Sequence, residues 1–311
     1  MLRSRRLTKL KTFWILIVVV LVVGILTIAY FSYPKPLKNE TPKPADNEVN
    51  VCLHLSEYDN QTISYLSDLR VKWVRTDWLT SNNEMSVYSQ SLQDNGINLL
   101  AIVNASIFPF QNSMLEEWNR TVTEIATSEG FKSTDAIEIC NEPNGNNSFI
   151  PPETYYEMLK SAYAIIKNYT TIPVVFAGIS PNSEVHNYNW TSYLNAVFAY
   201  NDTNEYFDYM GIHLYDDTVI NLSTLQFVKN LTDKPIWLTE TGKPSENNDE
   251  TAQATYLSTV YSTFKPLVSK IFIYELKDKG LSSYGEDHFG LLTYNGTRKE
   301  SYHTVWDISH K

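Results

Sequence analysis

Cysteine is scarce in this sequence of 311 residues, and several catalytic motifs are missing. Cys52 and Cys140 are the only two cysteines, which excludes a disulfide framework and a Cys-x-x-Cys metal cluster. There is no H-E-x-x-H, no G-x-S-x-G and no P-loop, because Gly242 and Lys243 lack the upstream glycine that a P-loop needs. We therefore expect neither a metal nor an organic cofactor.

Charged residues make up only 19% of the sequence, and they are unevenly distributed. Residues 1–48 hold 8 basic and 3 acidic side chains. The rest of the chain holds 17 basic and 32 acidic side chains, a net charge of −15. A domain with this charge repels nucleic acid and anionic polymers, so we expect no nucleic-acid partner and a neutral partner instead.

The first residues of the chain differ in composition from the remainder. Five basic residues lie within 1–12, and an uncharged apolar run, FWILIVVVLVVGILTIAYF, covers 13–31. Its length suits a membrane span of about 20 residues rather than a signal-peptide core of roughly 7 to 15. We expect a basic cytoplasmic tail, a single transmembrane anchor and a domain outside the cell membrane. Secretion after cleavage of a signal peptide is the alternative, although no A-x-A-like site follows the run.

Two further features agree with an outside location. The segment 32–48 carries four prolines among charged residues and is predicted to be a stiff linker between membrane and domain. Asn-x-Ser/Thr triplets, which can accept N-linked glycans, are frequent. They begin at Asn39, Asn60, Asn104, Asn119, Asn146, Asn168, Asn189, Asn201, Asn221, Asn230 and Asn295.

From residue 49 to residue 311, short apolar runs alternate with longer amphipathic ones. The strand-like runs are EVNVCLHL, VKWVRTD, INLLAIVN, DAIEICNE, IPVVFAGIS, YFDYMGIHLY, PIWLTETG and KIFIYELK. Helical patterns between and after them cover 82–94, 114–130, 152–168, 249–265 and 299–310. Eight βα units predict an α/β fold, the (β/α)8 TIM barrel of about 250 residues. A doubly wound open sheet is the alternative, but no glycine-rich phosphate loop follows the first strand.

The barrel prediction bears on the two cysteines. They fall on the first and fourth predicted strands, which are not neighbours in a barrel. A disulfide needs Cα atoms within about 7 Å of each other, so we expect two free thiols.

Active sites of this fold lie at the carboxyl ends of the strands, so residues there are the candidate site residues. The predicted ends carry a polar and aromatic set. Its members are His54, Arg75, Asp77, Trp78, Asn104, Asn141, Glu142, His213, Tyr215, Glu240, Tyr274 and Glu275.

Two carboxylates stand out among these residues. Glu142 and Glu240 are 98 residues apart, about three βα units of roughly 30 residues, which places them on strands four and seven. Two carboxylates that face each other across a barrel mouth are the minimum apparatus for cleaving a glycosidic bond. The plainer alternatives are a carboxylate at the start of a helix for Glu142 and a solvated loop residue for Glu240.

At these residues the sequence resembles clan A of the retaining glycoside hydrolases, the four-over-seven superfamily of cellulase-like and β-glycosidase-like barrels. The resemblance lies in Asn-Glu-Pro after strand four and Thr-Glu-Thr-Gly on strand seven. It extends to VKWVRTD, GIHLY and HFGLLTYNGTRKESYH, and so covers the whole domain from 49 to 311. An archaeal cell surface would suit the anchor and the many triplets.

The resemblance implies a role for each residue that matches a motif. Glu142 would be the acid/base and Glu240 the nucleophile, while Asn141 would bind the sugar 2-hydroxyl. Arg75 and Tyr215 would keep Glu240 ionised, and His213 would line the −1 subsite. A carboxylate beside an arginine and a hydroxyl does stay charged.

The sequence also departs from the clan at one position. Many members have a tryptophan on strand eight as a sugar platform, whereas this chain has Tyr274. We expect Tyr274 and Trp78 to contact substrate, although Trp78 and Trp118 also fit core positions. A glycan on Asn104 or Asn146 would crowd the cleft, so both are expected to be unmodified or to point away from it.

Together these features predict a membrane-anchored, externally facing retaining glycoside hydrolase for a neutral, β-linked oligo- or polysaccharide. Two alternatives remain open. One is a catalytically silent surface barrel that binds carbohydrate. The presence of both carboxylates argues against it, because a protein that only binds has no need for the pair. The other is an anchored transglycosylase, which would share every one of these residues.

Overall fold

The computed structural model of the chain describes residues 47–54, 58–59, 61–78, 82–105, 114–215, 218–245, 249–280 and 285–311. All of them belong to the compact unit from Pro42 to Lys311. The predicted tail and membrane anchor, and the linker up to residue 46, lie outside these ranges. No helix within these ranges is long and apolar enough to cross a membrane.

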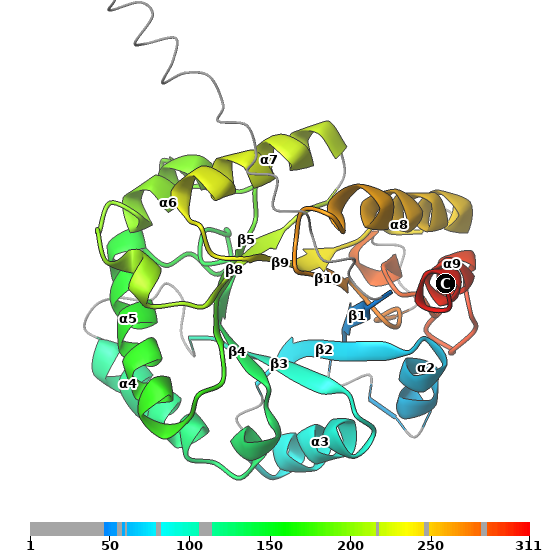
Figure 1. Cartoon of the computed structure of the whole chain (residues 1–311), viewed down its shortest axis with the longest axis horizontal. Helices are drawn as coiled ribbons and strands as arrows, with labels where there is room; N and C mark the ends of the chain where they lie inside the picture. Colours follow the sequence, from blue (N-terminus) through cyan, green and yellow to red (C-terminus); the bar gives the residue numbers. More distant parts are fainter. Residues whose placement is uncertain are drawn as a thin grey trace, which may run out of the picture. The chain divides into compact units, whose positions relative to one another are not determined.

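Eight parallel strands close into a barrel in the order β1-β10-β9-β8-β5-β4-β3-β2, which confirms the predicted (β/α)8 architecture (Figure 1). Closure occurs at β1, where Val51 is paired with Val74 on one side and Ile273 on the other. The strands are β1 (Val49–Cys52), β2 (Val71–Asp77), β3 (Asn98–Val103), β4 (Ala136–Asn141), β5 (Val174–Ile179), β8 (Tyr209–His213), β9 (Ile236–Thr241) and β10 (Lys270–Ile273).

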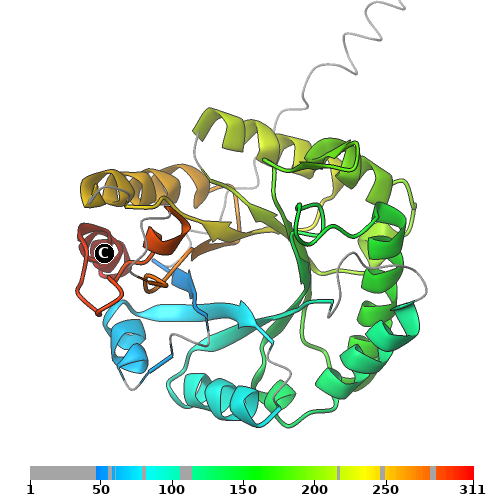
Figure 2. The ribbon, with the colours of Figure 1, turned by 180° about the vertical axis from the view of Figure 1, so that it is seen from behind.

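Helices surround the strands, as both views of the ribbon show (Figures 1 and 2). The predicted helical patterns agree with five of them within a few residues at each end. Local signals explain some of the boundaries: Pro152 opens α5, and the side chain of Asp249 caps α8 by accepting from the Ala252 N–H. The α-helices are α2 (Thr62–Asp68), α3 (Asn82–Asp94), α4 (Leu115–Ala126), α5 (Pro152–Tyr169), α6 (Trp190–Val197), α7 (Thr218–Leu231), α8 (Glu250–Phe264) and α9 (Glu300–Ser309).

Shorter elements lie between these helices and strands. They are the 3-10 turns η3 (Gly130–Ser133), η4 (Thr203–Glu205) and η6 (Gly285–His288), and the two-stranded hairpin of β6 (Glu184–Val185) and β7 (Tyr188–Asn189). The hairpin and the helices α2, α6 and α7 have no counterpart among the predicted elements.

The barrel interior is filled by aromatic side chains at the amino ends of the strands. Trp237 lies against Trp73, with ring centroids 5.4 Å apart, and stacks on Tyr209 at 4.5 Å. Phe272 packs beside Trp237 at 6.0 Å. Because this aromatic layer closes one end, polar groups deeper in the barrel can reach solvent only at the carboxyl ends of the strands.

A buried lysine ties the C-terminal segment to the barrel. Lys299 is 2% exposed and precedes α9. Its Nζ donates to Asp278 Oδ1 at 2.7 Å, to Ser245 Oγ at 2.9 Å and to the His288 carbonyl at 3.3 Å. These contacts join the segments that follow β9 and β10 to the last helix, so this ion pair holds the end of the fold together.

Replacing Lys299 by alanine should destabilise the domain by about 3–5 kcal/mol, since it leaves the Asp278 carboxylate buried without its cation. Urea unfolding of the two proteins measures the difference. The matched control is Lys132→Ala, which removes a lysine with a 70% exposed side chain paired to Glu129 and should cost less than about 1 kcal/mol. Equal losses in both variants would contradict this account of the Lys299 contact.

Candidate active site

A cavity of about 700 Å³ opens at the carboxyl ends of the barrel strands, where this fold places active sites. Residues from all eight strands, or from the loops directly after them, contribute to its wall. Six of the eight residues that were predicted to have a catalytic or substrate-binding role line it, namely Arg75, Asn141, Glu142, Tyr215, Glu240 and Tyr274. Other lining residues are Cys52, His54, Asp77, Asn182, Gly242, Pro244 and Phe289.

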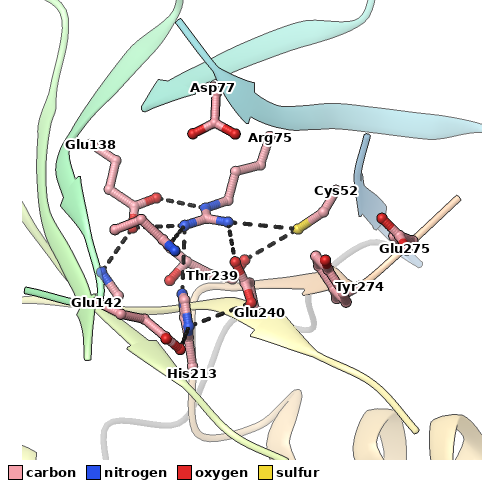
Figure 3. Close-up of polar contacts among 12 residues, drawn as sticks. Cys52, Arg75, Asp77, Glu138, Glu142, His213, Thr239, Glu240, Tyr274 and Glu275 are labelled. Carbon is pink, nitrogen blue, oxygen red and sulfur yellow. Dashed lines mark hydrogen bonds and ion pairs between the residues drawn. The ribbon is translucent and has the colours of Figure 1, made fainter. Parts of the chain in front are cut away.

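Arg75, on β2, is at the centre of the polar contacts (Figure 3). Its side chain is 3% exposed. Nη1 donates to Glu240 Oε1 at 2.6 Å, and Nη2 donates to Asn141 Oδ1 at 2.7 Å. Nε and Nη2 also donate to the two carboxylate oxygens of Glu138, at 2.6 and 3.0 Å. Burial lowers the pKa of Arg75, but the two carboxylates outweigh burial and raise it, so the guanidinium stays charged.

Glu240, on β9, is held as a carboxylate. Oε1 accepts from Arg75, and Oε2 accepts from the Tyr215 hydroxyl at 2.6 Å. Burial alone raises the pKa of Glu240, but the charges of His213 and Arg75 and the hydrogen bonds from Tyr215 and Arg75 together lower it to about 2. Glu240 is therefore ionised at neutral pH and well below it.

An irregularity in β9 directs this carboxylate into the cavity. Leu238 and Thr241 of β9 pair with Ile271 and Ile273 of β10, so three steps on β9 match two on its neighbour. The register on the other side, between β8 and β9, shifts just before the pairing of His213 with Glu240. Such an extra residue re-aims a side chain and is frequent beside active sites.

Glu142 follows β4 and has a different environment. Its side chain is 30% exposed, and its Oε1 lies 2.8 Å from Nδ1 of His213. Its backbone has a φ of +44°, in the left-handed region that residues other than glycine seldom occupy. The Gly145 N–H and the Ser148 hydroxyl fix this turn by donating to the Glu142 carbonyl at 2.7 and 2.6 Å.

The backbone of β4 also departs from simple alternation. Cys140 has a φ of +67° and packs in the outer core, whereas Glu138 and Asn141 both contact Arg75 inside the barrel. A regular strand would have placed Cys140 on the same face as Glu138. The left-handed residue shifts this pattern by one and brings Asn141 into the cavity. Both Cys140 and Cys52 are free thiols, as predicted.

His213, at the end of β8, contacts both carboxylates from a buried position inside the barrel. It is fully buried and is not among the residues that line the cavity. Its Nδ1 lies 2.8 Å from Glu142 Oε1 and 3.4 Å from Glu240 Oε2. Burial lowers the pKa of His213, but Glu240 and Glu142 outweigh burial and raise it.

The two carboxylates approach each other closely around this imidazole. One oxygen of Glu142, Nδ1 or Nε2 of His213 and one oxygen of Glu240 all lie within 4.8 Å of one another. Within the described ranges, no other group of potential metal ligands is this close. The guanidinium of Arg75, 2.6 Å from Glu240, already supplies a positive charge there, so the group is poorly suited to a divalent cation.

Aromatic rings form one wall of the cavity beside Glu240. Tyr215, Tyr274 and Phe289 pack edge to face, with centroids between 5.5 and 6.5 Å apart. The Tyr274 hydroxyl accepts from Lys279 Nζ and lies 3.3 Å from His54 Nε2. Tyr274 therefore lies on the cavity wall, and its predicted contact with substrate stays a prediction.

The structure does not bring Trp78 to the cavity, so the prediction that it contacts substrate is not supported. It is 9% exposed and belongs to the outer hydrophobic core, where it lies against Phe131. The reason is the period of the strand: Trp73 and Arg75 point into the barrel, so two residues further Asp77 lines the cavity and Trp78 points outward. Trp118 is also a core residue, 2% exposed.

Sequence reasoning missed two residues that shape the site. Glu138 is fully buried and accepts from Arg75 and from the Gly178 N–H at 2.7 Å. The sequence signal was a charged residue in the middle of an apolar strand. The second is Gly178, on β5. Only glycine fits at this position, because a Cβ there would lie 2.0 Å from His213 Nε2.

Asn104 has a structural task at the cavity rim. Its Nδ2 donates to Asp77 Oδ1 and its Oδ1 accepts from the Asn141 N–H, both at 2.8 Å. The amide nitrogen that a glycan would need is engaged. This geometry favours the expectation that Asn104 is unmodified. Asn146 is exposed, so the expectation for that residue stays a prediction.

Comparison with known families gives a match over most of the domain. Residues 61–287 match the glycosyl hydrolase catalytic core family, a range that contains Arg75, Glu142, His213 and Glu240. No curated protein sequence matches the chain.

Solved structures of glycoside-processing enzymes share the fold. A family 39 glycoside hydrolase from Bacteroides cellulosilyticus WH2 is similar with a TM-score of 0.66 and 18% identity, over 85% of this chain and 64% of that one. A family 128 (subgroup II) endo-β-1,3-glucanase from Sorangium cellulosum has a TM-score of 0.59 and 17% identity, over 79% and 94%. A β-1,3-glucanosyltransferase from Rhizomucor miehei has a TM-score of 0.56 and 15% identity, over 81% of this chain and 96% of that one. The chain thus spans less than two thirds of the family 39 enzyme.

Gly178→Ala should impair the site more than the fold. The added methyl group would meet His213 Nε2 at 2.0 Å and Thr239 Oγ1 at 2.8 Å, so the imidazole must leave the two carboxylates. We expect about 1–3 kcal/mol of destabilisation by overpacking, with loss of most activity. Gly96→Ala is the control: Gly96 has a φ of +69° and no neighbour within 4 Å of a Cβ. It should lose stability but keep activity, and a Gly178→Ala protein with normal activity would contradict this account.

Glu240 should also make stability depend on pH. Its pKa is lowered from 4.5 to about 2 on folding, so the ionised carboxylate stabilises the fold above about pH 4.5 and this contribution is lost as the pH falls toward 2. Between pH 7 and pH 3 the loss is about 2 kcal/mol. Urea unfolding at the two pH values should show a smaller loss for Glu240→Gln than for wild type. The exposed variant Glu157→Gln should follow wild type.

Proposed function

The chain belongs to the glycosyl hydrolase catalytic core family, and from this membership we propose that it is a retaining glycoside hydrolase for a neutral, β-linked oligo- or polysaccharide. Glu240 is the nucleophile and Glu142 the acid/base. Asn141, Arg75, His213, Tyr215 and Tyr274 position these groups or the sugar.

The observation that supports a retaining mechanism most directly is the closeness of the carboxylates. An oxygen of Glu142 and an oxygen of Glu240 lie within 4.8 Å of each other. Retaining enzymes place the two groups about 5 to 5.5 Å apart, whereas inverting enzymes need roughly 6.5 to 9.5 Å to admit a water molecule between sugar and base. The separation leaves room for the sugar carbon and not for an additional water.

The environments of the two carboxylates suit different roles. Glu240, kept ionised by Arg75 and Tyr215, attacks the anomeric carbon and forms a covalent glycosyl-enzyme as the glycosidic bond breaks. Glu142, which has no guanidinium contact within the described ranges and is 30% exposed, gives its proton to the leaving oxygen. It then takes a proton from the water that attacks the glycosyl-enzyme, and Glu240 is released as a carboxylate.

A neutral substrate is proposed from the charge of the domain and the composition of the cavity. The domain carries a net charge of −15. The cavity combines carboxylates and amides, which bind hydroxyl groups, with the rings of Tyr215, Tyr274 and Phe289, which can pack on a sugar face. The two similar enzymes of matching length act, by their names, on β-1,3-glucan, so this polymer belongs in any substrate panel.

Transglycosylation is the second candidate, and one of these structures favours it. The similar Rhizomucor miehei enzyme is a glucanosyltransferase, in which a sugar hydroxyl replaces water as the acceptor. The same two carboxylates serve both reactions. A silent carbohydrate-binding barrel is less well supported, because binding alone does not need Glu240 to be held ionised next to Glu142.

We further propose that the domain is anchored to the cell membrane by residues 13–31 and faces outward. The apolar run and its basic flank support this proposal. The positions of the N-glycosylation triplets agree with it, since Asn146, Asn168, Asn189, Asn201, Asn230 and Asn295 are exposed. Asn221, by contrast, is 3% exposed and has no room for a glycan.

The test is release of reducing ends from β-1,3-glucan, β-1,4-glucan, mannan and xylan by residues 47–311, for wild type and for Glu240→Gln. We expect one polymer to be cleaved and the variant to lose activity by at least about 10³-fold, because the nucleophile is removed. Proton NMR of the first products should show the β-anomer, the signature of retention.

The matched control is Glu157→Gln, the same change on the exposed face of α5, which should leave activity unchanged. Longer oligosaccharides among the products would favour the transglycosylase. Binding of a polymer without turnover by wild type would favour the silent barrel, and an initial α-anomer from a β-linked substrate would rule out retention.

A further inference from the structure

Glu138 is a carboxylate close to the catalytic centre that no step of the proposed reaction uses. It lies on β4, four residues before Glu142, and its side chain is completely buried. It is not among the residues that line the cavity, so it does not touch a bound sugar. In Figure 3 it lies on the opposite side of the Arg75 guanidinium from Glu240.

Three N–H groups satisfy this buried carboxylate. Arg75 donates through Nε to Oε2 at 2.6 Å and through Nη2 to Oε1 at 3.0 Å, the paired geometry in which guanidinium and carboxylate match. The Gly178 N–H donates to Oε1 at 2.7 Å. Gly178 is also the residue against which His213 packs, so Glu138 is joined to two parts of the site.

The guanidinium of Arg75 has five N–H bonds, and each has an acceptor. Glu138 takes two of them, from Nε and Nη2. The others go to Glu240 Oε1, to the sulfur of Cys52 at 3.9 Å and to Asn141 Oδ1. Because the bidentate pair fixes the plane of the guanidinium, Glu138 determines where the bonds to Glu240 and Asn141 point.

We propose that Glu138 is a positioning residue for the nucleophile: it holds Arg75 in the one orientation that serves Glu240 and Asn141 together. A second effect follows from charge. Arg75 is shared between two carboxylates, so Glu138 limits how strongly the cation is drawn to Glu240 and leaves that carboxylate able to attack. The kinetic part of this inference rests on the proposed function.

The alternative is an ion pair that only stabilises the barrel. A structural pair would change the free energy of unfolding, and its loss would act on the reaction independently of Arg75. A positioning residue acts through Arg75, so its effect should vanish once Arg75 is gone. A double-mutant cycle separates the two.

The cycle uses wild type, Glu138→Gln, Arg75→Met and the double variant, assayed on the polymer that wild type cleaves. In Glu138→Gln the amide places a donor against the donors of Arg75, while the shape is kept. We expect kcat to fall about 10- to 100-fold, as for a misplaced catalytic group, with little change in KM. The double variant should be no slower than Arg75→Met. A Glu138→Gln kcat within about twofold of wild type, or a double variant as slow as the product of both single losses, would overturn the proposal.

Two further measurements distinguish a positioning role of Glu138 from a purely stabilising one. Glu138→Asp keeps the charge but cannot reach both Nε and Nη2, so it should lose part of kcat. Full kcat in this variant, with Glu138→Gln unfolded, would assign Glu138 to stability alone. Hydrogen exchange of the Arg75 Nε–H, followed by ¹⁵N NMR, needs no turnover: protection in wild type and its loss in Glu138→Gln are expected. If wild type cleaves no polymer, the proposed function fails, while this measurement still decides whether Glu138 fixes Arg75.

Discussion

The guanidinium of Arg75 is the buried charge around which the polar part of the barrel is built. Between Glu138 and Glu240 it converts two carboxylates that could not be buried alone into a satisfied network. The same group orients Asn141 and faces Nε2 of His213 at 3.5 Å. Without this cation the interior would have to be apolar at this depth, as it is in the aromatic layer below.

The division between these two layers explains how a packed barrel holds a reactive site. The rings of Trp73, Trp237 and Phe272 fill the amino ends of the strands and supply hydrophobic stabilisation. The polar groups are confined to the carboxyl ends, where the chain departs from regular strand geometry in β4 and β9. These departures cost local stability, and they lie where they aim Glu142 and Glu240 at each other.

The different partners of the two carboxylates give them different chemistry. Glu240 has a guanidinium and a phenol hydroxyl, which favour its charged form, and it lies deeper. Glu142 has an imidazole contact and partial access to solvent. His213 lies against both, so both carboxylates act on the same imidazole and raise its pKa. One fold thus places two glutamates in different electrostatic environments a few ångströms apart.

The sequence by itself determined the barrel and the places of Glu142 and Glu240 at the carboxyl ends of two of its strands. Eight apolar runs with helical patterns between them allow few other arrangements, and the carboxyl ends of parallel strands meet at one edge. What only the tertiary structure decided was which neighbours of those ends face inward. Strict alternation puts Cys140 with Glu138, yet Asn141 takes the inward place. The reason is physical: a left-handed residue or an extra residue in a strand reverses every later side chain, and such irregularities depend on pairing with strands far away in the sequence.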